Sequence, residues 1–327
     1  MSDHDVLLRR GRTCRLLSRL YLEGLKDPLL PALREVPMLV QALPGAIDWD
    51  GMAADHQHLF GFNVFPYAGV FLDPDGRLNG PVADEVRQVF LRSGCPLPLT
   101  GESLDHLGHE LAWLAHMMHA EAEALQDGIA AEVRRIRWMQ RRFLDHHLLG
   151  WLPLFLEAAR GQASPFFRRL LDLTQDVVWA HRRALGPAPP EEATPFTLPA
   201  PPALLDLPET GLKEIAGYLA TPVWAGFFLG RDDIGALGRR IGVPCGFGNR
   251  QQMLVNLVRA AAEYDRLVHL VAALKERVAV TRAGLRDLVA GDLPGLREAL
   301  TPWLERLETT DRLLDRVRGA AQERGRS

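Results

Sequence analysis

The sequence predicts an all-α protein, and three observations support this fold class. Apolar residues recur every three to four positions over long stretches, which is the period of an amphipathic helix. Runs of alternating β-branched residues, the signature of strands, are nearly absent. Prolines and glycines fall between the periodic stretches, where they separate one helix from the next.

The first helices are predicted from apolar stripes and from the residues that flank them. Leu17, Leu20, Tyr21 and Leu25 recur at helical spacing before Pro28 interrupts the pattern. A second helix is predicted to begin near Ser103, with Asp105 in its first turn, where the helix dipole favours an anion. The apolar stripe of this helix consists of Leu104, Leu107, Leu111, Leu114 and Met118.

Two further helices are expected before residue 186. The first runs from about Ile129 to Gly150 and ends before Pro153. It carries a row of side chains four positions apart, formed by Met139, Phe143, His147 and Trp151. The second begins at Ser164-Pro165, an N-cap followed by proline at the first helical position, and reaches about Leu185.

A proline-rich segment at residues 186–208 divides the sequence. We therefore expect a helical bundle at 1–185, a linker at 186–208 and a second, smaller helical domain at 209–327. In the second domain Gly242-Val243-Pro244 is expected to break one helix, and a long helix is expected from about Asn249 to Val278. The stretch from Leu293 to Val317 is expected to form a closing helical hairpin.

Composition excludes several classes of protein. The chain has 327 residues, of which 47% are hydrophobic and 24% charged, so it can bury a sizeable core and is not a disordered tail. Its formal net charge is −3, and the charges of its two halves are each close to balanced. Nucleic acid is therefore not an expected partner. The three cysteines, Cys14, Cys95 and Cys245, lie far apart without a CxxC pair, which argues against disulfides and thiolate zinc sites.

We expect no secretory signal and no membrane anchor. The first residues are acidic, whereas a secretory signal would begin with basic residues and continue with an apolar stretch. The longest apolar run, Leu148 to Ala159, falls short of the roughly 20 residues that span a bilayer. We therefore expect a cytoplasmic protein without a membrane anchor.

Eleven histidines raise the alternative of a metal- or haem-binding helical protein. They include the pairs His56-x-His58, His106-x-x-His109, His116-x-x-His119 and His146-His147. The zinc-protease pattern fails, because Trp113 stands where a second histidine would follow His109-Glu110. No nucleophile elbow, P-loop or dinucleotide fingerprint occurs either. We therefore expect no metal, no cofactor and no enzymatic activity.

The segment from Leu59 to Tyr67 is unusually rich in aromatic and glycine residues for a predicted loop, and a turn at Asp73-Pro74-Asp75-Gly76 follows it. Two interpretations remain open for this loop: it fills its own bundle, or it lines a groove for an apolar peptide. In the second case, Asp105 and His106 at a helix start would supply the polar anchor.

Three ordered motifs resemble the TorD/DmsD/NarJ-type family of redox-enzyme maturation chaperones. The motifs are Leu59-Phe60 with Pro66-Tyr67 and Val70, then Asp105-His106-x-x-x-Glu110-Leu111, and finally Phe143-x-x-x-His147-Leu148-x-x-Trp151. The resemblance covers roughly residues 10 to 185. It implies an all-helical chaperone that binds the N-terminal leader, often a twin-arginine signal, and the apo form of a molybdopterin-containing oxidoreductase until its cofactor is inserted.

The resemblance also implies the residues of the peptide site. Tyr67, Asp105 and His106 are the expected peptide contacts, while Glu110, His147 and Trp151 match family positions and either contact the peptide or organise the core. Residues 209–327 lie outside the resemblance; they would be a client-specific or oligomerisation unit, or an adaptor that recruits another protein. The oligomeric state, including a homodimer, is left open.

Overall fold

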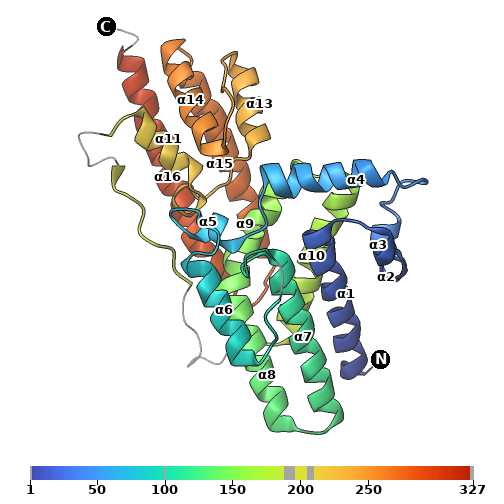
Figure 1. Cartoon of the computed structure of the whole chain (residues 1–327). Helices are drawn as coiled ribbons and strands as arrows, with labels where there is room; N and C mark the ends of the chain where they lie inside the picture. The colour runs from blue at the N-terminus through green and yellow to red at the C-terminus, as the bar shows by residue number, and fades with distance from the viewer. Residues whose placement is uncertain (1, 99–100, 188–195, 205–209, 325–327) are drawn as a thin grey trace. The chain divides into compact units, whose positions relative to one another are not determined.

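Helices make up the regular structure of the chain, which confirms the predicted fold class (Figure 1). The computed structural model describes residues 2–98, 101–187, 196–204 and 210–324. Within these ranges there is no β-strand, and an isolated antiparallel bridge joins Tyr67 to His106.

The chain divides into two compact units. Unit 1 comprises residues 1–73, 77–196 and 292–299, and unit 2 comprises residues 74–76, 197–291 and 300–327. The change from unit 1 to unit 2 after Phe196 falls inside the predicted linker, of which residues 188–195 and 205–208 lie outside the described residues. That 1–185 and 209–327 act as separate domains stays a prediction.

Unit 1 is built from the helices of the N-terminal half. They are α1 (Asp3–Glu23), the 3₁₀ turn η1 (Asp27–Leu29), α2 (Leu30–Arg34), α3 (Pro37–Val40), α4 (Trp49–His56), the π-helical η2 (Gln57–Asn63), α5 (Ala68–Leu72), α6 (Pro81–Ser93), α7 (Leu107–Gln126), α8 (Ala130–Phe143), the π-helical η3 (Leu144–Leu148), α9 (Leu149–Arg160) and α10 (Pro165–Ala184). The predicted helix that starts at Ser164-Pro165 is confirmed as α10.

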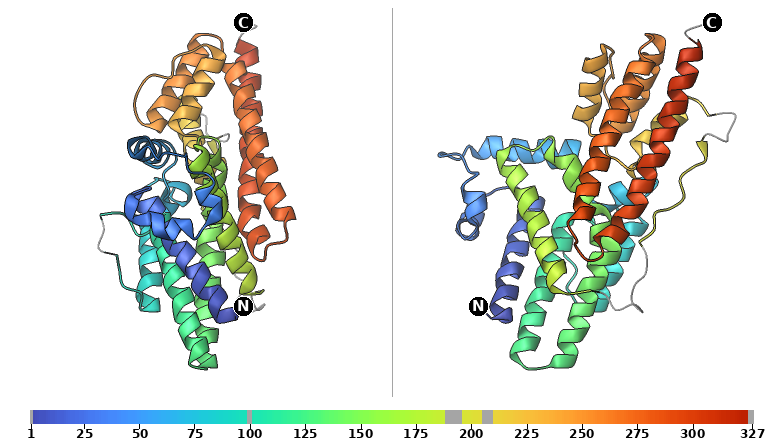
Figure 2. Two further views of the ribbon diagram at one scale, coloured as in Figure 1. Left: turned by 90° about the vertical axis from the view of Figure 1, so that its right-hand side faces the viewer. Right: turned by 180° about the vertical axis from the view of Figure 1, so that it is seen from behind.

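Helices α1 and α7 pack closely along each other in unit 1 (Figure 2). Gly108, in the first turn of α7, makes this approach possible: a Cβ added there would lie 2.5 Å from Leu22 Cγ and 2.9 Å from the carbonyl oxygen of Ser18. Only glycine allows the two backbones to come this close. The start of α7 is thereby fixed against α1.

The start of α7 differs from the prediction. The helix begins at Leu107 with His106 as its N-cap, so Asp105 lies before the helix and not in its first turn. The reason is tertiary: the Asp105 carbonyl accepts the N–H of Ala68 at 2.9 Å, and the Leu107 N–H donates to the Pro66 carbonyl at 2.8 Å. These bonds hold Asp105 in a turn before the helix, and His106 in an extended conformation at its N-cap.

The predicted helix from Ile129 to Gly150 is also different. It is divided by η3 and continues as α9 to Arg160, with Pro153 inside α9 and not at its end. Every residue from Leu149 to Leu156 is buried. The apolar packing of this segment outweighs the backbone hydrogen bond that a proline removes, so the helix continues.

The apolar segment at Leu59 to Tyr67, predicted as a loop, is largely helical. Its first part belongs to the π-helical η2, in which Leu59, Phe60 and Asn63 are buried. Two of the three sequence motifs therefore lie on π-helical turns, since His147 belongs to η3. Such wide turns are frequent at functional sites.

Unit 2 is built from the helices of the C-terminal half. They are α11 (Leu212–Ala220), α12 (Pro222–Ala225), α13 (Arg231–Ile241), α14 (Arg250–Glu263), α15 (Leu267–Ala290) and α16 (Leu296–Arg324), of which the last begins within residues assigned to unit 1. Gly242, with φ 73°, ends α13 in the left-handed conformation, as the predicted break requires.

The predicted long helix from Asn249 to Val278 is wrong, because the chain turns between α14 and α15 at Asp265, whose φ is 53°. The closing hairpin predicted for Leu293 to Val317 is also wrong, because this stretch from Leu296 onward belongs to one continuous helix, α16, which runs antiparallel to α15 (Figure 2). Lys275 of α15 binds Asp311 and Asp315 of α16 at 3.3 and 2.7 Å.

Candidate functional site

The bridge between Tyr67 and His106 brings the first two motifs together. Asp105 is fully buried beneath it, and both of its carboxylate oxygens have partners. Oδ2 accepts the N–H of Gly69 at 2.8 Å, and Oδ1 accepts the hydroxyl of Ser103. A Cβ at Gly69 would lie 2.9 Å from Asp105 Oδ2 and from the Arg77 carbonyl, so glycine is needed there. Asp105 therefore joins the start of α5 to the segment just before α7.

His106 caps α7 and is held neutral. Its Nδ1 accepts the N–H of Gly108 at 3.0 Å, which places the ring proton on Nε2. Burial, together with His109 and His56, lowers the pKa of His106 to about 3. Among the described residues no partner binds its Nε2–H, and 5% of the residue is exposed. The Nε2–H is thus available to a ligand.

Tyr67 and Glu102 form the outer part of this group. The Tyr67 ring meets the His106 ring edge-on, with 4.8 Å between the centroids. Its hydroxyl donates a hydrogen bond to Glu102, and burial together with that carboxylate raises the pKa of Tyr67. Tyr67 is half-buried and Glu102 is exposed. Glu102 was not predicted from the sequence. Its position three residues before Asp105 is the one sequence feature that could have indicated that it belongs to the site.

Glu110, His147 and Trp151 form an inner group. Nε2 of His147 lies 2.6 Å from Oε1 of Glu110, and both residues are buried. Burial raises the pKa of Glu110. Burial alone would lower the pKa of His147, but the Glu110 carboxylate reverses this and raises it. Both shifts favour the protonated form, so the pair holds a proton within its hydrogen bond.

Trp151 completes the inner group. The residue is fully buried, and its side chain lowers the pKa of Glu110 as a hydrogen-bond donor. The contact between the two side chains does not have the geometry of an ordinary hydrogen bond. By that criterion, neither Trp151 Nε1 nor Glu110 Oε2 has a partner in the described part of the chain. The Asp105 carboxylate also raises the pKa values of Glu110 and His147, so the inner group and the bridge are coupled electrostatically. Of the six predicted site residues, Tyr67 is the most exposed.

A second buried polar network in unit 1 was not predicted. His181 accepts a hydrogen bond from Arg10 at Nδ1, at 3.2 Å, and its Nε2 lies 2.7 Å from the side-chain amide oxygen Oε1 of Gln140. Gln140 in turn donates to the buried Glu121 at 2.7 Å, and Arg137 also binds this carboxylate, at 2.5 Å. The five residues come from four helices, so no local sequence pattern could have revealed the network.

The described residues contain neither a metal-binding group nor a membrane-spanning helix. Among the described residues, no group of three or more His, Cys, Asp or Glu side chains is placed to hold a metal ion. Within the same ranges, none of the helices combines the length and apolar character needed to cross a bilayer.

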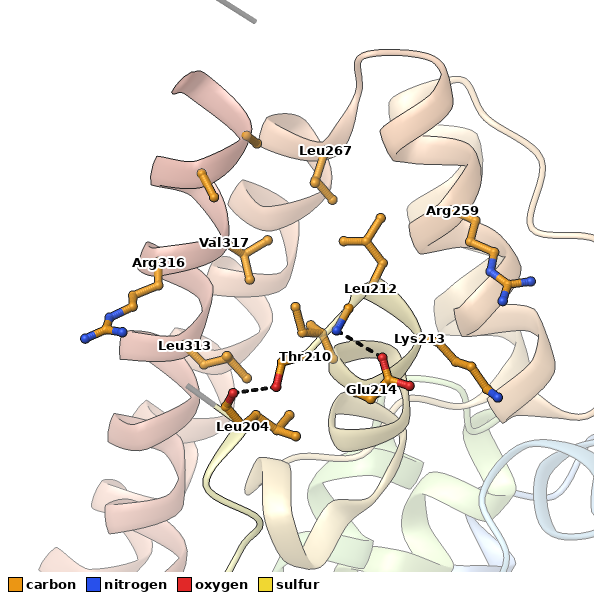
Figure 3. Close-up of a pocket in the computed structure, with 14 residues that line it drawn as sticks. Leu204, Thr210, Leu212, Lys213, Glu214, Arg259, Leu267, Leu313, Arg316 and Val317 are labelled. Carbon is orange, nitrogen blue, oxygen red and sulfur yellow. Dashed lines mark hydrogen bonds between the residues drawn. The ribbon is translucent and has the colours of Figure 1, made fainter. Parts of the chain in front are cut away.

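Unit 2 contains a cavity of about 790 Å³ between α11, α14, α15 and α16 (Figure 3). Aliphatic side chains line its inner part, and three cationic side chains, Lys213, Arg259 and Arg316, stand around it. On one side the Thr210 hydroxyl donates to the Leu204 carbonyl at 2.6 Å. The sequence motifs assign no role to this cavity.

Comparison with known proteins places the similarity in the N-terminal half. The family described as Nitrate reductase delta subunit matches residues 26–157, a range that contains all six predicted site residues. The chain is 34% identical over 148 residues to "Chaperone protein TorD" of Vibrio cholerae serotype O1, a match that covers 42% of this chain and 65% of that protein.

Two other relatives extend this finding. The chain is 30% identical over 152 residues to "Chaperone protein TorD" of Vibrio vulnificus, covering 43% of this chain and 68% of that protein. It is 39% identical over 90 residues to "Selenate reductase assembly chaperone protein" of Thauera selenatis, covering 27% of this chain and 44% of that protein. These relatives carry the names of chaperones and not of enzymes.

Proposed function

The chain belongs to the TorD family of redox-enzyme maturation chaperones, which is not a family of enzymes, and from this premise we propose that it is a cytoplasmic chaperone for a molybdopterin-containing oxidoreductase. It binds the N-terminal leader of the client's catalytic subunit, often a twin-arginine signal. It holds the apo subunit until cofactor insertion, before export or assembly.

The observation that carries the proposal is the pairing of the Tyr67 loop with the start of α7. The bridge places a half-buried aromatic ring, an exposed carboxylate and a free N–H beside one another, on Tyr67, Glu102 and His106. An extended peptide needs these groups: an apolar surface for its hydrophobic stretch, an anion for its arginines and a donor for its backbone carbonyls.

The buried residues take a different part in this proposal. Asp105 is fully buried and its carboxylate binds Gly69 and Ser103, so it fixes α5 against the segment before α7 and does not touch the peptide. Glu110, His147 and Trp151 hold the inner ends of α7, η3 and α9 together. The leader's arginines then meet the exposed Glu102, where a bidentate contact is possible.

A leader-binding experiment tests the function and the role of Glu102 separately. Isothermal titration calorimetry would measure the affinity of the full-length chain for a twin-arginine leader peptide. We expect Glu102→Gln to weaken binding about fivefold, the scale of an exposed ion pair, and to have no effect on a peptide whose arginines are replaced by glutamine.

Glu123→Gln is the matched control, since Glu123 is an exposed carboxylate farther along α7. Its affinity for the leader should equal that of the unmodified chain. A chain that binds no leader at all contradicts the proposed function, whereas leader binding that Glu102→Gln does not weaken contradicts only the role of Glu102.

A further inference from the structure

The cavity of unit 2 offers a patch of partly exposed aliphatic surface (Figure 3). The side chains of Leu204, Leu212, Ile215, Leu267 and Val317 are half-buried and line the same space, with Leu313 buried behind them. Its volume, about 790 Å³, lies in the range of roughly 300–1,000 Å³ that is usual for ligand sites. An occupant with apolar side chains would remove this surface from water.

The surroundings of the cavity are cationic. Lys213, Arg259 and Arg316 are exposed, and within the described residues none of the three has a carboxylate partner. Glu214 is the one acidic side chain in the described lining, and its Oε2 already accepts the N–H of Gly211 at 3.0 Å. The cavity therefore combines an apolar floor with a positive rim.

We propose that this cavity binds an acidic, amphipathic helical segment of a partner protein. The segment would place aliphatic side chains at i, i+3, i+4 and i+7 on the floor of the cavity, and carboxylates beside Lys213, Arg259 and Arg316. A twin-arginine leader would meet like charges at this rim, so the cavity is a second site and not an alternative leader site. The inference does not rest on the leader-binding proposal.

The test uses the full-length chain and two synthetic peptides of about 18 residues, an ordinary length for a helical ligand. Both carry leucines on one helical face; the opposite face carries glutamates in one peptide and lysines in the other. Fluorescence anisotropy should show that the glutamate peptide binds at least about tenfold more tightly. In Lys213→Glu/Arg259→Glu/Arg316→Glu this preference should be reversed.

The matched control is Arg9→Glu/Arg12→Glu/Arg15→Glu on α1 of unit 1. These arginines are likewise exposed, have no carboxylate partner in the described part of the chain, and line a smaller cavity of about 250 Å³. The control changes the net charge by the same amount and should leave glutamate-peptide binding unaltered. If binding is lost in the control and kept in the unit 2 variant, the assignment to unit 2 is overturned.

Three further results would overturn the proposal: equal binding of the two peptides, displacement of the peptide by phosphatidylglycerol vesicles, or a homodimer that the unit 2 substitutions dissociate. The last two would assign the cavity to a lipid surface or to a second copy of the chain. If circular dichroism shows that the triple reversal unfolds the chain, Lys213→Gln/Arg316→Gln serves instead, with about threefold weaker binding expected. Leader binding, measured in parallel, should be the same in every unit 2 variant.

Discussion

Two histidines of unit 1 are kept neutral by their surroundings, each in a defined tautomer. His106 accepts a hydrogen bond at Nδ1 from Gly108, and His181 accepts one at Nδ1 from Arg10. Burial is the main reason that the pKa of each is lowered to about 3; the neighbouring His109 and His56 add to it at His106, and three arginines add to it at His181. An unfolded histidine has a pKa of about 6.5, so folding removes protons from both rings in mildly acidic solution.

The difference between the folded and unfolded pKa values of His106 and His181 predicts that the fold is less stable in acid. Between pH 6.5 and about 3 the unfolded chain binds one more proton at each histidine than the folded chain does. The stabilisation is therefore complete above pH 6.5 and is lost as the pH falls toward 3, by up to about 1.4 kcal/mol per pH unit and histidine. His106→Asn keeps an N-cap acceptor and removes one titration. Urea unfolding of this variant should depend less steeply on pH than unfolding of the unmodified chain; an unchanged dependence contradicts the prediction.

Asp105 provides a second prediction at this scale. Asp105→Ala would leave the buried N–H of Gly69 without its acceptor, so we expect the free energy of unfolding to fall by about 1–3 kcal/mol. Asp105→Asn retains an acceptor oxygen and should cost less. Glu102→Gln, at an exposed position, is the control and should leave stability unchanged. Equal stability of all three variants in urea unfolding would show that Asp105 does not hold the loops together.

At the scale of elements, the contact between α1 and α7 depends on two glycines with different surroundings. A Cβ at Gly11 of α1 would have ordinary contacts, at 3.4 Å from the Ala115 carbonyl oxygen and 3.5 Å from Met118 Cβ. A Cβ at Gly108 of α7 would clash with the side chain of Leu22 and with the backbone of Ser18. The helices are thus closest near the start of α7.

The two glycines predict opposite effects of the same substitution. Gly11→Ala should stabilise the chain by up to about 1 kcal/mol, because alanine has the higher helix propensity and the space exists. Gly108→Ala should destabilise it by more than about 1 kcal/mol, because a backbone carbonyl cannot move aside as a side chain can. Thermal unfolding of the pair checks the prediction, and a shift of both melting temperatures in one direction would refute the packing described.

The elements also show what the sequence can and cannot predict. Apolar periodicity and proline position identified α10 correctly, because both are local signals. The start of α7 was missed because the Asp105 carbonyl is used in a contact with the distant Ala68. The break at Asp265 was missed because neither glycine nor proline marks it; aspartate adopts the left-handed conformation more readily than most residues, but it does so too rarely to predict a break.

The sequence also predicted part of the candidate site and missed part of it. The motifs gave Tyr67, Asp105 and His106 together, and the structure brings them together. They could not distinguish the buried Asp105 from the exposed Glu102, because burial depends on how the loops pair and not on residue type.

At the scale of the whole molecule, each of the two units has its own buried core. Leu154 is fully buried in unit 1, and Leu257 is fully buried in unit 2. A core of its own is what allows a unit to unfold cooperatively by itself.

This organisation predicts two separate unfolding transitions. Leu154→Ala and Leu257→Ala should each cost about 2–5 kcal/mol, the usual loss for truncating a buried leucine. Each substitution should shift one transition in a urea titration and leave the other in place. If both substitutions shift a single transition equally, the chain unfolds as one cooperative body.

On the proposed leader-binding function, the neutral state of His106 bears on how a bound peptide would leave. With the pKa of His106 near 3 and that of Tyr67 raised, neither side chain changes charge over the range of acidity that living cells tolerate. A drop in intracellular pH during acid stress would therefore not discharge a client by protonating these two groups. Under that function, release would have to come from an event other than protonation of these two groups, such as the folding of the client's own chain around a newly inserted cofactor.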